Sequence, residues 1–270
     1  SMKMNRIILF ILLLVLTKSF AQENPGARSI ALAHSDISGR GDPFSLFNNP
    51  SLISSIYNRQ FGIFYSPSPF DVKELANGFA SYIEPTPYGV IGVGFMVYGF
   101  ELYKETLFTL GYGKSFDSKF ALGLSSSYQK ISIVNYGSKG IITFNLGGSA
   151  KLSESINLGF LLTNLTRTSI NDEENQIPVS LAAGVNILPL EKFNIYGAVY
   201  KELGFDPSIK FGCEYGLFDF FLLRFGISTQ PDIYAFGVGI TYSFIQTDYA
   251  VTSHPFLGLT HQFGLIIQFE

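Results

Sequence analysis

The sequence predicts an all-β protein: a transmembrane antiparallel β-barrel of about fourteen strands with a small N-terminal hatch. Segments that alternate large apolar with small or polar residues recur about every 12 to 15 residues, as in membrane hairpins. The chain is 47% apolar, with 27 Phe and 15 Tyr, yet only 14% charged, whereas soluble domains carry about 25% charge. After residue 21 the chain has no long apolar run of the kind that a helical membrane protein needs.

The first 21 residues match a cleaved export signal. Lys3 and Arg6 form a basic start, residues 7–16 are an unbroken apolar run, and Ser19-Phe20-Ala21 fits a small-x-small cleavage site. The apolar run is about half the length of a transmembrane helix. We therefore predict a signal peptide over residues 1–21, a hatch over 22–57 and a barrel over 58–270, located in a bacterial outer membrane.

The clearest strand pattern lies at residues 232–245. One face carries only large apolar side chains, and the other carries only small or polar ones. A soluble sandwich would place Lys and Glu on its polar face, whereas Gly, Ser, Thr and Asn suit a barrel lumen. The large residues are Tyr234, Phe236, Val238, Ile240, Tyr242 and Phe244, and the small ones are Ala235, Gly237, Gly239, Thr241 and Ser243.

The same pattern predicts fourteen strands, an even number as single-chain bacterial barrels require. The weakest are the first and the one before His254, and without them the count would be twelve. The predicted strands are 59–66, 74–84, 88–97, 105–115, 119–131, 139–151, 155–165, 177–187, 192–201, 207–217, 219–229, 232–245, 247–253 and 257–269.

Turn chemistry predicts how the barrel is oriented. Tight connections are expected near residues 84–87, 116–118, 152–154, 188–190 and 217–219, and longer ones at 66–73, 98–104, 132–138 and 167–176. The two sets alternate along the chain. Because short turns face the periplasm and longer loops face outward in these barrels, both termini are predicted to be periplasmic.

The last strand carries a further signal. Its end resembles the C-terminal pattern by which the barrel assembly machinery recognises bacterial outer-membrane barrels, with Gln262, Gly264, Ile267 and Phe269 in the matching places. Most such signals end on the aromatic residue, whereas here Glu270 follows. The alternative interpretation is an edge strand of a soluble sandwich.

Residues 22–57 do not alternate, and their glycines and small residues suggest a compact plug. They resemble the N-terminal segment of FadL-type barrels and their PorV/PorQ-like relatives, which typically reads G-A-R, a small-residue stretch, an acidic turn and N-P-A-G-L. Gly26-Ala27-Arg28 and Asn49-Pro50-Ser51-Leu52 stand in those places, with Ser51 for Ala and no Gly before Leu52. Residues 248–261 strengthen the resemblance to the PorV/PorQ branch.

The resemblance implies a hatch inside a fourteen-stranded barrel and two alternative functions. FadL-type members pass small hydrophobic molecules passively, with lateral exit between strands. PorV-like members are scaffold or shuttle subunits of the type IX protein secretion system. A non-specific polar pore is a third alternative, against which a plugged lumen argues. The hatch residues Phe44, Leu46, Phe47, Asn49 and Pro50 are candidates for a ligand path, or they pack the plug against the wall.

Four charged residues are predicted to face the lumen: Lys151, Lys210, Glu214 and Arg224. Glu214 and Arg224 fall on neighbouring strands and could form an ion pair. An unpaired charge facing lipid at mid-membrane costs about 2–4 kcal/mol, so inward placement is expected. Ordinary filling of the lumen with compensated charge is preferred to a selectivity filter.

No catalytic constellation is found, so the protein is not expected to be an enzyme, and no cofactor or metal is implied. His34, His254 and His261 lack metal-ligand spacing, and the lone Cys213 cannot form an intramolecular disulfide. Gly89–Gly94 lies within an alternating strand without the following helix that a dinucleotide loop requires. The net charge of −3 gives no reason to expect nucleic acid. Expected partners are outer-membrane lipid, the assembly machinery, and a hydrophobic small molecule or a secretion subunit.

Overall fold

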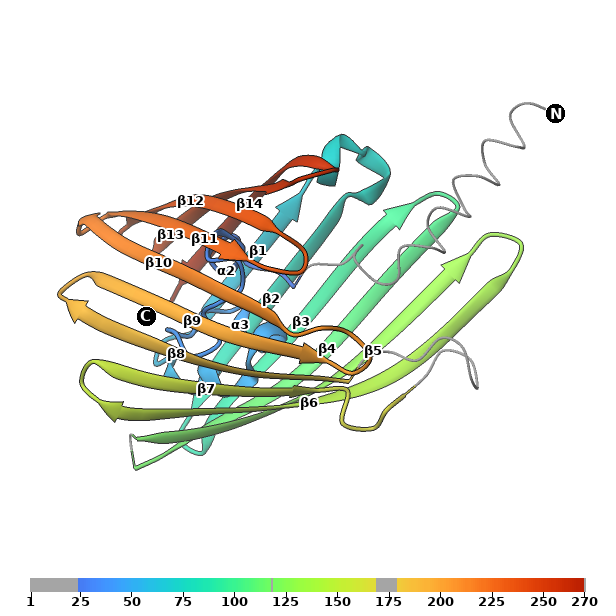
Figure 1. Ribbon diagram of the computed structural model, residues 1–270. Coiled ribbons are helices and arrows are strands. Elements are labelled where there is room, and N and C mark those ends of the chain that lie inside the picture. The colour runs from blue at the N-terminus through green and yellow to red at the C-terminus, as the bar shows by residue number, and fades with distance from the viewer. Residues whose placement is uncertain (1–23, 118, 169–178, 270) are drawn as a thin grey trace.

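The protein is a closed barrel of fourteen antiparallel strands, seen in a computed structural model that describes residues 24–117, 119–168 and 179–269 (Figure 1). Each strand pairs with its neighbours in the chain, and β1 pairs with β14 to close the sheet. Closure leaves no free sheet edge, which is how a β-structure satisfies its backbone groups within a bilayer. The predicted signal peptide and residues 22–23 of the predicted hatch lie outside the described residues.

The fourteen predicted strands are confirmed, and the twelve-strand alternative is wrong. The two weakest predictions correspond to β1 and β13, which pair on both sides and complete the wall. The strands are β1 Gln60–Ser66, β2 Asn77–Thr86, β3 Gly89–Phe100, β4 Tyr103–Phe116, β5 Phe120–Ile133, β6 Gly137–Ser153, β7 Ile156–Thr163, β8 Ser180–Leu190, β9 Phe193–Glu202, β10 Ser208–Phe218, β11 Phe221–Ser228, β12 Ile233–Tyr242, β13 Ile245–His254 and β14 Gly258–Gln268.

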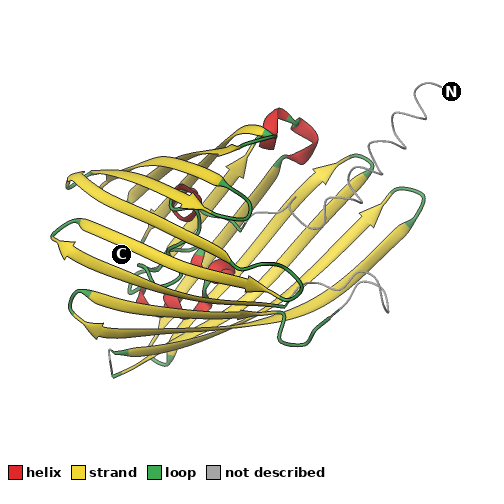
Figure 2. Cartoon of the chain, viewed as in Figure 1, coloured by secondary structure: helices red, strands yellow, loops and turns green. Residues whose placement is uncertain are grey.

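The helices are short, as Figure 2 shows. The first described ones lie in the N-terminal segment: α2 Ala27–Ala31, α3 Ser45–Asn48 and the 3-10 helix η1 Pro50–Ser55. Two further 3-10 helices, η2 Pro69–Asp71 and η3 Lys73–Leu75, lie between β1 and β2. Among the described residues, no helix is long and apolar enough to cross a membrane.

The barrel has two unlike ends. At the turn end, where β1 begins and β14 ends, all connections are tight; the loop end lies opposite. The predicted loops at 98–104 and 132–138 are shorter than expected, because β3 to β6 run on to hairpins at Phe100–Tyr103 and Ile133–Gly137. The predicted loop at 66–73 corresponds to the connection 67–76, whereas residues 169–176 of the predicted loop 167–176 lie outside the described residues. Placement of the turn end in the periplasm remains a prediction.

The two faces of the wall differ as the alternation predicts. On β12, Tyr234 and Phe236 each expose 57% of their surface, whereas Ala235 between them is fully buried. Large apolar side chains are exposed in the same way on every strand except β13, whose outward apolar residues are only partly exposed. An apolar surface of this extent is not stable against water and is what a lipid environment requires.

Residues 24–57, which we call the inner segment, lie inside the barrel (Figure 1). Helix α2 packs against β11 to β14, whereas η1 packs against β3 to β6 on the other side. Between them, Ile37 packs against Leu161 of β7 and Ala182 of β8. The segment therefore reaches the wall in most directions.

Wall glycines make room for the inner segment. A Cβ on Gly123 would lie 2.2 Å from the carbonyl carbon of Pro50, and one on Gly226 would lie 2.4 Å from that of Leu32. Contacts this short cannot exist, so the backbone of the segment occupies space that side chains would otherwise fill. Other glycines that face the segment are Gly62, Gly92, Gly94, Gly111, Gly113, Gly147, Gly159, Gly184, Gly212, Gly237 and Gly264.

Two adjacent glycines of β6 test this arrangement. Gly147→Ala places a Cβ 2.1 Å from Asn49 Oδ1, whereas the nearest atom to a Cβ on Gly148 is 3.8 Å away. We expect Gly147→Ala to loosen the inner segment at a cost of about 1–3 kcal/mol, as overpacking does, and Gly148→Ala to have no such effect. Hydrogen exchange of residues 24–57 measures the difference. Equal protection in both variants would contradict the close contact.

Candidate functional site

The inner segment is joined to the wall by buried charges centred on Arg28 of α2. Arg28 Nε donates to Glu214 Oε2 of β10 at 3.1 Å, and Arg28 Nη2 donates to the Tyr196 hydroxyl of β9 at 3.0 Å. Within the segment, Arg28 Nη1 donates to Asp36 Oδ2 at 3.2 Å and to the Arg40 carbonyl at 3.1 Å. The guanidinium of Arg28 therefore connects β9 and β10 of the wall with Asp36 and Arg40 of the inner segment.

The wall continues the chain of ion pairs. Glu214 and Arg224 lie directly opposite in the β10–β11 register, and Arg224 Nε donates to Glu214 Oε2 at 2.7 Å. Arg224 Nη1 donates to Asp248 Oδ1 of β13 at 2.6 Å, and Gln246 Nε2 donates to Asp248 Oδ2 at 2.7 Å. We call Arg28, Asp36, Asp42, Glu214, Arg224 and Asp248 the Arg28 network.

The Arg28 network holds two guanidinium groups and four carboxylates, all buried. Burial of so many charges is costly unless each is paired and hydrogen-bonded. Removal of either arginine would therefore leave buried carboxylates without their partner, which makes the network a strong positional constraint on the inner segment. Burial raises the pKa of Asp42, and the neighbouring Arg28 acts against that rise.

Asp42 connects the network to α3. Its Oδ1 accepts hydrogen bonds from the backbone N–H of Phe44 at 2.9 Å and of Ser45 at 3.0 Å, so it holds the residues at which the helix begins. Its other oxygen lies 3.9 Å from Arg28 Nη1. The orientation of α3 therefore depends on a residue that the network holds in place.

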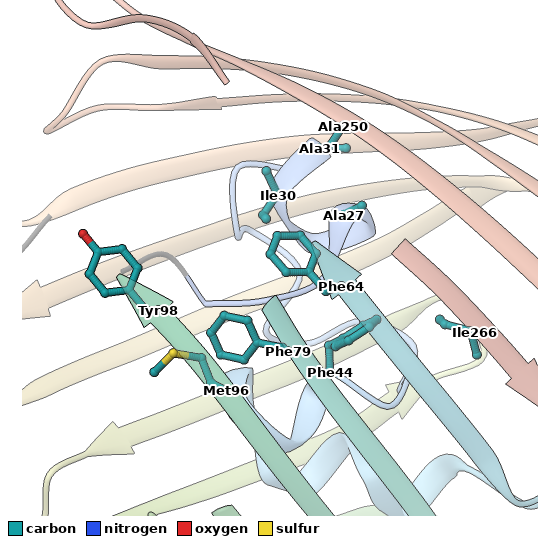
Figure 3. Packing of buried hydrophobic residues seen from close by; sticks show 10 residues of the cluster. All are labelled: Ala27, Ile30, Ala31, Phe44, Phe64, Phe79, Met96, Tyr98, Ala250 and Ile266. Atoms are coloured by element: carbon teal, nitrogen blue, oxygen red, sulfur yellow. The ribbon is translucent and has the colours of Figure 1, made fainter. Parts of the chain in front are cut away.

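Outside the Arg28 network, the inner segment meets the wall through two apolar clusters and through hydrogen bonds such as that from the Tyr200 hydroxyl to the His34 carbonyl at 3.0 Å. The first cluster joins α2 and Phe44 to the inner face of β1, β2 and β3 (Figure 3). The members of this first cluster are Ala27, Ile30, Ala31, Phe44, Phe64, Phe79, Met96, Tyr98, Ala250 and Ile266, and Leu75, Tyr103 and Leu107 pack against it. The members of the second cluster are Leu46, Ile53, Ile56, Ile83 and Val90.

The five residues predicted for a ligand path all lie in the inner segment but fall into two groups. Phe44, Leu46 and Phe47 belong to the apolar clusters. Asn49 and Pro50 begin η1: Asn49 Oδ1 accepts from the Ser51 N–H at 3.1 Å, and Pro50 occupies the first turn, where its missing N–H costs nothing. Asn49 Nδ2 also donates to the Ile37 carbonyl at 2.7 Å, which ties two parts of the segment together.

Of the predicted lumen charges, the structure brings only Glu214 and Arg224 together. The Lys151 ammonium lies near the turn end, 2.9 Å from Glu154. The Lys210 ammonium lies over the Tyr200 ring, 4.1 Å from its centroid. Both are therefore separate from the Arg28 network.

The histidines also lie apart. Burial lowers the pKa of His34 to about 3, so it is neutral, and its Nδ1 lies 3.1 Å from Ser29 Oγ. His254 packs edge-on against Phe70, and His261 Nδ1 lies 2.6 Å from the Tyr249 hydroxyl. Among the described residues, no group of three or more His, Cys, Asp or Glu side chains could hold a metal.

The predicted assembly-signal residues lie on β14 and just after it. Gln262 and Gly264 face inward, and Gly264 lies beside Ala27 of α2. Ile267 pairs with Phe61 of β1, and the Phe269 N–H donates to the Arg59 carbonyl at 2.8 Å. Their use as an assembly signal remains a prediction.

A hollow of about 920 Å³ opens at the turn end beside the start of β1 and the end of β14. Arg59, Tyr82 and Phe269, which line it, lie at outward positions of the wall. The hollow is therefore separate from the Arg28 network and from both apolar clusters.

Sequence reasoning found the Glu214–Arg224 pair but missed Arg28, Asp36, Asp42 and Asp248 as members of one site. A signal did exist for Asp248, because it occupies an inward position of its strand, where an acidic side chain needs a partner. For Arg28 there was only the small-residue stretch around it, which gives no distance to β10.

The fold and the site define a class: closed antiparallel barrels with an apolar outer surface and an N-terminal segment in the lumen. No family model and no curated protein matches the chain. Several solved structures, however, match its fold. The Pseudomonas putida toluene transporter TodX aligns with a TM-score of 0.71 at 12% identity, over 91% of this chain and 97% of that one. A Pseudomonas aeruginosa FadL homologue aligns at 0.65 and 10% identity, over 92% and 98%.

A third match is the Acinetobacter baumannii outer membrane protein Omp33, with a TM-score of 0.54 at 7% identity, over 79% of this chain and 98% of that one. At such identities the likeness shows the fold alone. That fold is the one implied by the FadL-type resemblance, and the PorV/PorQ branch remains a prediction.

Proposed function

We propose that this protein is a bacterial outer-membrane barrel that passes small hydrophobic molecules without an energy source, with the inner segment as its hatch. The observation that carries the proposal is the apolar lining of one side of the lumen. Inward positions of β1, β2 and β3 hold Phe64, Phe79, Ile83, Met96 and Tyr98, all buried. A barrel that passes polar solutes has no use for such a lining.

The rest of the lumen contrasts with this lining. The inward positions of β5 and β8 carry Ser125, Ser127 and Asn186. The Arg28 network and the inner segment occupy the middle of the barrel, which argues against an open polar pore. The neighbours described as a toluene transporter and a monoaromatic hydrocarbon channel support passage of apolar molecules. The secretion-subunit alternative gains no support from these neighbours, so passage is the preferred function.

Uptake by intact cells tests the proposal. We expect Gram-negative cells that carry the protein to take up N-phenyl-1-naphthylamine severalfold faster than cells without it, because the outer leaflet is the main barrier to this apolar probe. The fluorescence of the probe rises as it reaches phospholipid, which gives the rate. Entry of a polar chromogenic β-lactam serves as the control and should be unchanged. No acceleration, or equal acceleration of both compounds, would refute a selective apolar path.

A further inference from the structure

The inner face of β3 connects the two apolar clusters. Inward positions follow one another from the turn end to the loop end as Val90, Gly92, Gly94, Met96 and Tyr98. Val90 belongs to the second cluster, and Met96 and Tyr98 belong to the first. Two glycines therefore separate the clusters on β3 and leave a gap in its lining, which Ile83 of β2 partly fills beside Gly92: its Cδ1 would lie 2.9 Å from a Cβ there.

Helix α3 fills this gap. A Cβ on Gly94 would lie 2.3 Å from Phe47 Cζ, and a Cβ on Gly92 would lie 3.0 Å from Leu46 Cδ1. On the next strand, a Cβ on Gly111 would lie 2.3 Å from the same Leu46 atom. The side chains of one helical turn thus occupy space that the wall leaves free. Without them, the two clusters would border one continuous apolar groove.

Phe47 joins the clusters and is less constrained than its neighbours. It packs against both clusters, and its ring meets Phe79 edge-on at 5.3 Å. Phe44 and Leu46 are fully buried, whereas Phe47 is only half-buried. A half-buried ring over a glycine can change rotamer without moving the wall backbone.

Two features make α3 suited to local movement. It is a single turn of four residues, and Asp42 accepts a hydrogen bond from the N–H of its first residue, Ser45, so the same carboxylate contacts both the helix and Arg28. In contrast, the wall beside it has no opening: the β14–β1–β2–β3–β4 ladders pair without a register shift. The wall therefore offers no route between these strands, and the path along β3 from the first cluster to the second runs past α3.

We propose that α3 is a gate, and that Phe47 opens the path by leaving the gap over Gly94. This inference rests on the proposed function and adds its route: along β3 from the loop end to the turn end. Withdrawal of the Phe47 ring frees the space of one aromatic ring over Gly94, so the gate admits flat apolar molecules that enter end-on, the naphthylamine probe among them.

Three variants of the full-length protein test the gate through the naphthylamine uptake rate. Phe47→Ala removes the ring and should raise the rate severalfold over the wild type. Phe47→Ala combined with Gly94→Leu refills the gap from the wall, where the side chain cannot withdraw, and should lower the rate to that of cells without the protein. Ile37→Ala is the control, because it truncates an apolar residue of the inner segment that faces β7 and β8, away from α3, and it should leave the rate unchanged.

Heat-modifiable migration on detergent gels shows that each variant has formed a barrel. If the double variant does not assemble, Gly94→Ala replaces it: its Cβ would displace the Phe47 ring, so the rate should rise. Acceleration by the wild type with equal rates for Phe47→Ala and Ile37→Ala would overturn the gate and leave the proposed function standing. No acceleration by the wild type would overturn both.

Discussion

Arg28→Met is expected to release the inner segment from the wall. The substitution keeps much of the side-chain volume but removes the charge that lies 3.1 Å from Glu214 and 3.2 Å from Asp36. Removal of one partner of a buried ion pair costs about 3–5 kcal/mol. We expect this loss to appear as local opening of the inner segment, because the backbone hydrogen bonds that close the wall do not depend on Arg28. Hydrogen exchange of residues 24–57 should accelerate greatly, while that of the strands stays slow.

Two further variants separate charge from geometry. Arg28→Lys keeps the charge but cannot contact Glu214, Tyr196 and Asp36 at once, so its effect should be intermediate. Arg28→Met combined with Glu214→Gln removes opposite charges together and should recover part of the lost protection, which gives a coupling energy between the two sites. Exchange in Arg28→Met equal to that of the wild type would mean that the apolar clusters alone hold the segment.

Deletion of residues 24–57 is expected to convert the closed barrel into an open pore. The lumen of a fourteen-stranded barrel is too wide for wall side chains to fill, and the wall glycines that face the segment add further space. Single-channel conductance in planar bilayers should therefore rise from near zero to that of a water-filled pore.

The deletion must first be shown to form a barrel, again by heat-modifiable migration. Entry of the polar β-lactam supplies an independent readout in cells, and it should rise along with the conductance. A correctly formed barrel with unchanged conductance would place the barrier elsewhere and would remove the reason to describe residues 24–57 as a hatch.

The barrel wall was predictable because the polarity pattern of each strand's own residues specifies that strand. In a strand with one lipid-facing side, each residue shows its direction by its own polarity, so β12 could be assigned from Tyr234 to Tyr242 without knowledge of any partner. Strand order followed because short hairpins force sequential antiparallel pairing. The least accurate predictions were the loops at 98–104 and 132–138, since β3 to β6 continue beyond the apolar band with polar residues that resemble loops.

The site was only partly predictable. The Glu214–Arg224 pair could be found because both residues face inward on strands joined by one hairpin. Arg28 lies 186 residues from Glu214, and the inner segment has no period that would show its direction. The same holds for Phe47 and Gly94: nothing in a glycine of an alternating strand indicates which distant side chain lies over it.

The sequence by itself therefore determined the barrel and the direction of its strand faces and predicted about fourteen strands, because the burial of apolar surface against lipid acts on each residue separately. Only the tertiary structure decided what lies in the lumen: which wall glycines receive the plug, which charges meet at Arg28, and where α3 separates the two apolar clusters. Those contacts join segments far apart in the chain, and their energies depend on distances of a few ångströms that only the folded barrel fixes.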